Sequence, residues 1–223
     1  MYSTPTFQGA QNRAAFVNKV FFFFAMAILL SAGGVWLGIF TMLSFPELFF
    51  NSFFTIGAFI VSLGLVIAVH KVQGIRPLGY ILFALFAIIS GFTLTPILAS
   101  AGAVGGIPLI LKALLATTFT FAAAGLWGWI TKKDLSSLGG ILFVSVIGII
   151  LISVLNMFLQ TNILEMIASI MGIIVFTVYT AYDIQNIKER YPDEMFLSAA
   201  MGLYLDFINL FTSILRFFLA GRD

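Results

Sequence analysis

The chain has 223 residues, of which 61% are hydrophobic and only 9% are charged, and its mean hydropathy is +1.11. A soluble domain carries roughly 25% charged residues, so this composition excludes a soluble globular fold. The net charge of +2 gives no indication of a nucleic-acid partner, and the lack of cysteine excludes disulfides and thiolate chemistry. A single histidine, His70, excludes a multi-histidine metal site.

Seven apolar runs follow one another along the chain, each near the ~20 residues that a helix needs to cross a bilayer. They are Val20–Leu43, Leu48–Val69, Leu78–Ala99, Ile107–Ile130, Leu138–Leu159, Ile163–Ala181 and Phe196–Leu219. The runs are continuously apolar, without the period-two alternation of barrel strands. We therefore predict an all-α integral membrane protein with an N-terminal tail (1–19), one seven-helix domain (20–219) and a C-terminal tail (220–223).

The first run is longer than the ~7–15 apolar residues of a signal-peptide core, so we predict that it is retained as a membrane helix. Three prolines mark expected helix boundaries. Pro77 and Pro108 precede apolar runs, where proline suits the first helical position. Pro96 falls inside the third run and is expected to kink or end that helix.

Basic residues predict the orientation of the spans. They concentrate in the N-terminal segment and in the loops after the second, fourth and sixth runs. They are Arg13, Lys19, Lys71, Arg76, Lys132, Lys133, Lys188 and Arg190. The positive-inside rule places the N-terminus in the cytoplasm of a multi-pass protein of the cell (inner or plasma) membrane, and seven spans place the C-terminus outside. Arg216 and Arg222 favour the opposite side, which a re-entrant last segment would explain.

A polar stripe runs along the last span. Its members are Ser198, Gly202, Asp206, Asn209, Ser213 and Arg216, and their spacing places them on one helical face. Packing accounts for the small residues, but a carboxylate in mid-span indicates a working site. The sixth span carries a weaker stripe that ends at Asp183.

We predict that Asp183 and Asp206 bind protons or ions, with Asn209, Ser213 and Glu47 as pathway-lining candidates. Glu47 and Glu165 both stand at helix starts, where the helix dipole also explains an acidic residue. The membrane-spanning runs offer oxygen ligands and no thiols, and this set of ligands favours a hard cation such as calcium. Two carboxylates held about 4 Å apart would repel by roughly 4 kcal/mol at an effective dielectric near 20, so carboxylates at such a distance share a proton.

Two segments carry a family resemblance. Tyr182-Asp183-Ile184-Gln185 and the run from Leu203 to Phe211, Leu-Tyr-Leu-Asp-Phe-Ile-Asn-Leu-Phe, resemble the transmembrane Bax-inhibitor-motif family, whose bacterial members have seven helices. Thr131–Leu135 and Gly91–Pro96 are also similar to that family. The resemblance covers nearly the whole chain.

The resemblance implies six helices around a central C-terminal helix and a pH-sensitive calcium leak. It implies that Asp183 and Asp206 form the family's hydrogen-bonded sensor pair near the cytoplasmic side. Calcium-leak members also carry a latching arginine in the second helix, whereas this chain has no Lys or Arg between Glu47 and Val69. Another branch restrains a membrane-bound protease, and Thr131–Asp134 and Gly221–Asp223 resemble that branch.

Three functions therefore stay open. The first is a proton-regulated calcium leak, which is not an enzyme and whose partners are the bilayer, calcium and protons, with no cofactor. The second is an interaction protein that modulates a membrane protease. The third is an intramembrane aspartyl protease, although Tyr204-Leu205-Asp206 lacks the glycine that such enzymes place before the second aspartate.

Overall fold

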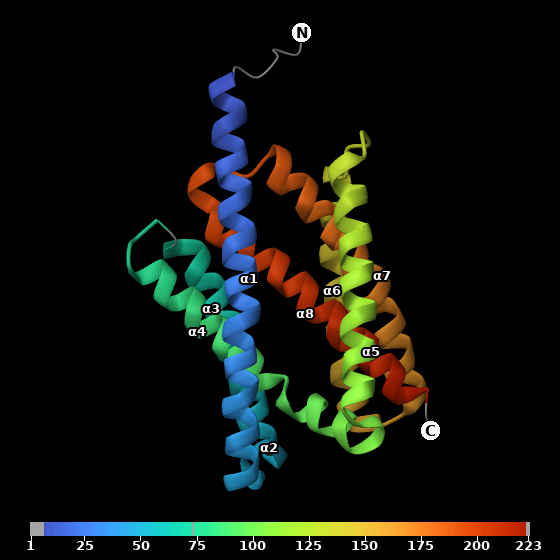
Figure 1. Ribbon diagram of the computed structural model, residues 1–223. Helices are drawn as coiled ribbons and strands as arrows, with labels where there is room; N and C mark the ends of the chain where they lie inside the picture. Colours follow the sequence, from blue (N-terminus) through green and yellow to red (C-terminus); the bar gives the residue numbers. More distant parts are fainter. Residues whose placement is uncertain (1–6, 73, 222–223) are drawn as a thin grey trace. The chain divides into compact units, whose positions relative to one another are not determined.

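The computed structural model describes residues 7–72 and 74–221, and the secondary structure of these residues is helical throughout, without strands (Figure 1). The all-α prediction is therefore confirmed. The helices are α1 (Phe7–Ser44), α2 (Pro46–Phe50), α3 (Ser52–Val72), α4 (Leu78–Thr93), α5 (Thr95–Ile130), α6 (Gly139–Leu159), α7 (Asn162–Glu189) and α8 (Phe196–Ala220). Two short 3₁₀ turns, Ser136–Leu138 and Asp193–Met195, precede α6 and α8. Apart from the five-residue α2, each of these helices corresponds to one of the predicted apolar runs.

Five stretches of the described residues are long and apolar enough to cross a membrane. They are Asn12–Ser44, Leu78–Ile130, Ser136–Leu159, Asn162–Glu189 and Asp193–Ala220. The second of these contains α4 and α5 and has 53 residues, which is long enough for two spans. Ile60–Val72, in α3, is a shorter apolar helix.

Three predicted boundaries were wrong. The third run was expected to continue to Ala99, but α4 ends at Thr93 and a new helix begins at Thr95, so the predicted break at Pro96 is confirmed while the boundary at Ala99 is wrong. The second run was expected to be one helix from Leu48, but Asn51 has an extended backbone that separates α2 from α3. Pro77 is the N-cap of α4, one position before the first helical residue.

Gly106 breaks α5. Its φ of 66° and ψ of −171° belong to a backbone region that is essentially restricted to glycine. Pro108 follows within the first turn after the break, where its missing N–H leaves no helical hydrogen bond unmade. The helix that resumes after Gly106 matches the predicted run Ile107–Ile130.

The N-terminal segment is helical over most of the predicted tail. Helix α1 begins at Phe7, well before the apolar run that starts at Val20. Residues 1–6 of the predicted N-terminal tail lie outside the described residues, as do Arg222 and Asp223 of the C-terminal tail. The basic residues Arg13 and Lys19 are therefore carried on the first helix itself.

The helices form two compact units. The first comprises Met1–Thr95 and Ile187–Tyr204, and the second comprises Pro96–Asn186 and Leu205–Asp223. Helix α8 contributes its N-terminal part to the first unit and the remainder to the second. The expectation of a single seven-helix domain stays a prediction.

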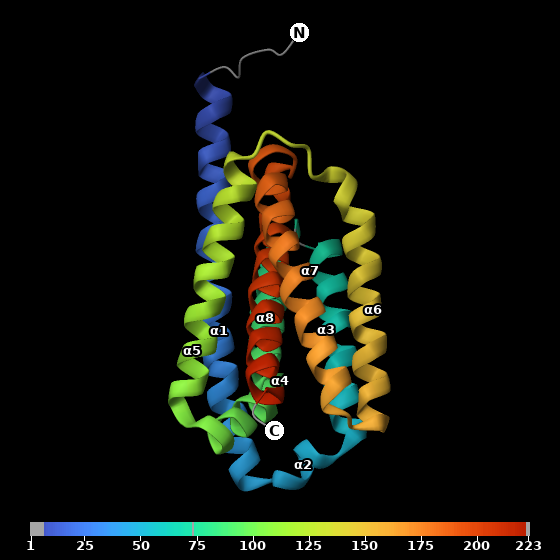
Figure 2. The same ribbon diagram turned by 90° about the vertical axis from the view of Figure 1, so that its right-hand side faces the viewer.

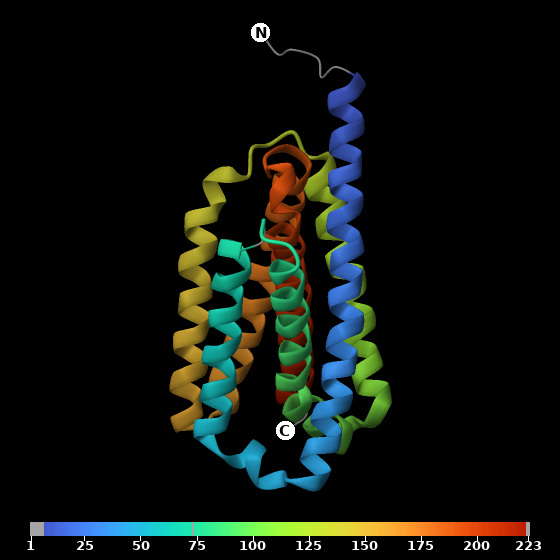
Figure 3. The same cartoon turned by 90° about the vertical axis from the view of Figure 1, so that its left-hand side faces the viewer.

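In the first unit, α1 and α4 run side by side at backbone contact (Figure 3). A Cβ on Gly34 would meet the carbonyl of Ile88, and a Cβ on Gly91 would meet the carbonyl of Ser31. Gly34 and Gly38 form the Gly-x-x-x-Gly spacing that lets membrane helices approach closely. On α8, Tyr204 is fully buried and stands edge-on to Phe86, with ring centroids 5.7 Å apart.

In the second unit, α7 and α8 are antiparallel neighbours (Figure 2). A Cβ on Gly172 of α7 would meet the Ser213 side chain of α8, so these helices also touch at a small residue. The core of this unit is formed by Ala101, Leu109, Ala113, Phe176, Leu210, Phe211, Ile214 and Leu215. The two helices that carry the candidate aspartates are thus packed on one another.

Helix α8 is long and apolar enough to cross a membrane. Helix α8 is unbroken over 25 residues, about 37 Å, which exceeds the ~30 Å hydrocarbon core. Arg216 near its end pairs with Glu165 at the start of α7, with Nη1 and Oε1 3.1 Å apart. This pairing neutralises a positive charge that the loop-charge rule counted against an external C-terminus.

We expect a reporter fused after Lys133 to be cytoplasmic and one fused after Asp223 to be external. The reason is the loop-charge asymmetry together with the continuous last helix. Alkaline phosphatase and fluorescent-protein fusions at the two positions measure this. Two reporters on the same side would contradict the seven-span topology.

Candidate functional site

The two predicted aspartates lie on neighbouring helices of the same unit. Asp183 is in the last part of α7 and is 9% exposed; Asp206 is near the middle of α8 and is 4% exposed. They are close enough for the charge on Asp183 to act on Asp206. The structure therefore brings the predicted pair together in a site that is nearly closed to solvent.

One oxygen of the pair has no hydrogen-bond partner among the described residues. It is Oδ2 of Asp206, which is buried. A buried oxygen of this kind calls for a proton, a water molecule or a cation to satisfy it, because an unpaired buried polar atom costs about 1–3 kcal/mol. Oδ2 of Asp206 is therefore a buried acceptor with bonding capacity left over.

Two tyrosines of α7, Tyr179 and Tyr182, lie near Asp183 of the pair in the chain. Tyr179 lies within electrostatic range of Asp183, Asp206 and Tyr182. The rings of Tyr179 and Tyr182 stand edge to face with centroids 6.1 Å apart, and the Tyr182 hydroxyl lies against Gly139 at the start of α6. Thr180, although buried, donates its hydroxyl hydrogen to the Phe176 carbonyl of its own helix at 2.8 Å. The titratable neighbours of the carboxylates on α7 are therefore phenols, which are neutral near pH 7.

The other predicted site residues have different surroundings. Asn209 is half-buried, one turn after Asp206 on α8. Ser213 is buried, donates to the Asn209 carbonyl at 2.7 Å and packs on Gly172, which accounts for it as a packing residue. Glu47 lies exposed in the first turn of α2, in the first unit, whereas the aspartates are in the second.

Part of the predicted stripe on α8 faces α7. Asp206, Ser213 and Arg216 lie successively against Asp183, Gly172 and Glu165, in the order expected for antiparallel helices. The helical count along the last span is confirmed for these three residues.

Gln185 is a buried residue that the sequence reasoning did not single out. It is 2% exposed, accepts a hydrogen bond from the Leu135 N–H and donates one to the Lys133 carbonyl, both at 2.8 Å. Its amide ties the segment before α6 to α7, half a turn from Asp183. Its amide, at the last residue of the segment Tyr182-Asp183-Ile184-Gln185 in an apolar helix, was the available signal.

A second polar network joins α6, α7 and α8 at the opposite end of α7. Glu165 accepts a hydrogen bond from Asn156 Nδ2 at 3.0 Å and pairs with Arg216. Asn156 in turn accepts a bond from the Thr161 N–H at 2.9 Å. The helix-dipole explanation of Glu165 is therefore incomplete, since the carboxylate also links three helices.

We expect Glu165→Gln and Arg216→Gln each to lower the free energy of unfolding by less than about 1 kcal/mol. Both side chains are partly exposed, 30% and 46%, so solvent screens the pair. Thermal unfolding in detergent of the two single variants and the double variant measures the coupling, which should be roughly 0.3–1 kcal/mol. Strictly additive losses would contradict a direct interaction.

The described residues contain no cluster of three or more His, Cys, Asp or Glu side chains that could hold a metal ion. Two carboxylates supply at most part of the six to eight oxygens that calcium takes.

Comparison with known proteins agrees with this architecture. Such an apolar bundle of long helices, with a carboxylate pair in its interior, defines a multi-pass membrane protein. Residues 13–223 match the family described as "Inhibitor of apoptosis-promoting Bax1". The chain belongs to this Bax inhibitor family, and the resemblance seen in the sequence is confirmed.

Bacterial relatives cover most of the chain. An uncharacterized protein of Campylobacter jejuni is 38% identical over 204 residues, 90% of this chain and 86% of that protein. The inner membrane protein YbhL of Escherichia coli is 33% identical over 215 residues, 91% of this chain and 90% of its own length. An uncharacterized membrane protein of Streptococcus pyogenes is 32% identical over 175 residues, 75% of this chain and 74% of its own.

Proposed function

We propose that this protein is a pH-sensitive calcium leak of the inner membrane in which Asp183 and Asp206 form the protonatable gate. The observation that carries the proposal is the burial of two carboxyl groups on adjacent helices, within electrostatic range of each other. Ionisable groups inside a membrane bundle are costly and mark proton or ion pathways. Membership of the Bax inhibitor family supports the same function.

The gate works through a shared proton. When one carboxyl group of the pair is protonated, it donates a hydrogen bond to the other and ties α7 to α8. When that proton leaves as the pH rises, two like charges remain in a poorly solvated site and repel one another. The helices then separate locally, and the freed oxygens become ligands for a hydrated cation.

Calcium flux into liposomes that contain only the purified protein tests this function. We expect calcium to enter these liposomes, as reported by an enclosed indicator, well above the rate in protein-free liposomes. The absence of flux at every pH would instead favour the interaction protein, since such a protein needs its partner. Hydrolysis of a membrane substrate that is lost in Asp→Asn variants would favour the intramembrane protease.

A further inference from the structure

The side chain of Arg13 contacts three backbone carbonyls within the first unit. Its Nε donates to the Lys188 carbonyl at 2.8 Å, its Nη1 to the Tyr191 carbonyl at 2.6 Å and its Nη2 to the Ile187 carbonyl at 2.6 Å. One guanidinium group from α1 thus binds three carbonyls at the end of α7 and in the turn that follows.

Two of these carbonyls, those of Ile187 and Lys188, belong to a helix end that needs partners. The last four carbonyls of a helix have no N–H partner within it, and α7 ends at Glu189. A cation there is also favoured by the negative end of the helix dipole. The rigid, planar guanidinium suits this position, since it presents donors in fixed directions, whereas an ammonium group is a single point.

The guanidinium is fixed from two further sides. It lies over the ring of Phe16, 4.6 Å from its centroid, and Phe16 is itself buried. Asp193 approaches Nη1 at 3.7 Å, but its side chain is 58% exposed, so this ion pair is weak. The carbonyl contacts, and not the ion pair, therefore hold the turn.

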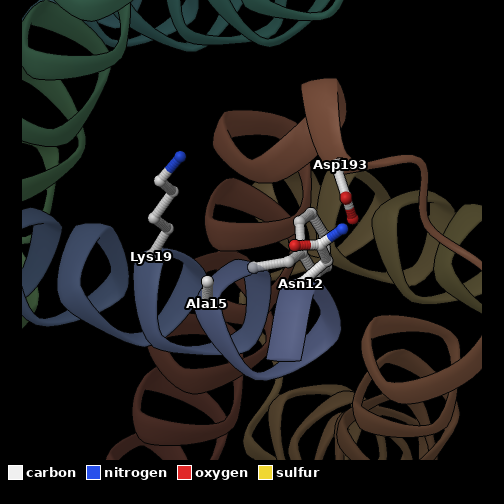
Figure 4. A pocket seen from close by; sticks show the side chains of 5 residues that line it. Asn12, Ala15, Lys19 and Asp193 are labelled. Carbon is white, nitrogen blue, oxygen red and sulfur yellow. The ribbon is translucent and has the colours of Figure 1, made fainter. Parts of the chain in front are cut away.

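Lys19 is a second basic residue of the same helix. It lies across a shallow hollow of about 170 Å³ from Asp193, a hollow that Asn12, Ala15 and Phe16 also line (Figure 4). Its ammonium group is 5.6 Å from the centroid of the Phe196 ring. Lys19 is thus a matched control for charge on α1.

We propose that Arg13 is a clamp that restrains gating by holding the C-terminal end of α7 and the α7–α8 turn against α1. Ile187 is one helical turn beyond Asp183 on α7. The clamped turn is also the covalent link between the helix of Asp183 and the helix of Asp206. Local separation of these helices requires this link to move, so a residue that fixes the link opposes opening. The clamp rests on the proposed leak function for its effect on flux, and not for its effect on the turn.

Hydrogen–deuterium exchange of the reconstituted protein tests the structural part of the proposal, that Arg13 holds the α7–α8 turn. In Arg13→Gln we expect the amides of Arg190, Tyr191 and residues 193–195 to exchange at least about tenfold faster, because the turn loses its anchor. Arg13→Lys should show an intermediate exchange rate, since lysine keeps the positive charge but lacks the several N–H donors of the planar guanidinium group. Lys19→Gln and Asp193→Asn should stay within about twofold of the parent.

Calcium flux from the same liposomes tests the functional half. We expect Arg13→Gln to raise the leak at least about threefold at fixed pH, with Lys19→Gln unchanged. Faster exchange in Arg13→Gln with an unchanged leak would overturn the clamp as a gating element, and unchanged exchange would overturn it altogether. Equal effects of Lys19→Gln and Arg13→Gln would also overturn it, because surface charge would then be the cause.

Two controls distinguish a failure of the proposed leak function, or of folding, from a failure of the Arg13 clamp. If the parent and every variant lack flux, the proposed leak function fails, and exchange alone decides whether Arg13 holds the turn. If Arg13→Gln does not fold, as judged by thermal unfolding in detergent, exchange and flux are compared between Arg13→Lys and the parent instead.

The cysteine-free chain also permits spin labels at introduced cysteines, for example at Ala14 and Glu189, both of which are exposed. Their distance distribution should broaden in Arg13→Gln.

Discussion

Asp183→Asn and Asp206→Asn should each flatten the pH dependence of calcium flux to within about twofold between about pH 5 and about pH 8. Each change removes one member of the pair that we propose to share a proton, while asparagine keeps the size of the side chain. The double variant should differ little from either single variant, because the first change already abolishes the shared proton. Flux into liposomes over this pH range measures all three.

Thr180→Val is a matched control for these variants. Thr180 is buried on α7 like Asp183, but its hydroxyl is bonded within its own helix. Its replacement should leave the pH profile unchanged. If the single Asn variants kept the pH profile of the parent, the aspartate pair would be structural and the sensor would lie elsewhere.

Gly34→Ala should destabilise the protein by about 1–3 kcal/mol, whereas Gly33→Ala should be neutral or stabilising by up to about 1 kcal/mol. The two glycines are adjacent on α1. A Cβ at Gly34 would meet the backbone of Ile88 and lie 3.0 Å from the N atom of Phe92, so α1 and α4 would have to move apart. A Cβ at Gly33 would meet nothing within 4 Å.

Thermal unfolding in detergent of the two alanine variants measures this difference. The same side chain is added to neighbouring positions of one helix, so helix propensity cancels and the contact with α4 remains. Equal unfolding temperatures would show that α1 and α4 do not touch at Gly34.

The sequence predicted the helices better than their ends. Long apolar runs specify helices through composition alone, which is why α6 and α8 agree closely with Leu138–Leu159 and Phe196–Leu219. The breaks depend on single residues whose effect is local. Pro96 was identified as a break, but the separation of α2 from α3 at Asn51 follows from backbone conformation, for which the apolar pattern carries no signal.

The aspartate pair was predictable because a mid-span carboxylate stands out in an apolar helix. The contacts that other residues make were less predictable. Arg13 was read only as a charge that orients the chain, since its three acceptors are backbone carbonyls from residues more than 170 positions away. Backbone acceptors have no sequence signature. Gly34 and Gly38 have a recognisable spacing, but the spacing alone does not identify α4 as the neighbour.

The pairing of Glu165 with Arg216 shows the same limit. Each residue had an adequate local explanation, a helix dipole for one and a membrane-end charge for the other. Only the antiparallel packing of α7 and α8 places the two side chains 3.1 Å apart. Tertiary contacts of this kind require the relative positions of helices, which hydrophobic periodicity does not contain.

Infrared difference spectroscopy of the reconstituted protein tests the shared proton most directly. As the pH is raised from about 5 to about 8, the parent should lose the carbonyl absorption of one protonated carboxyl group and gain that of one carboxylate. The Asp183→Asn, Asp206→Asn double variant should lack this change. A parent spectrum with no carboxyl signal that titrates in this range, or a signal that persists in the double variant, would contradict a proton shared by Asp183 and Asp206.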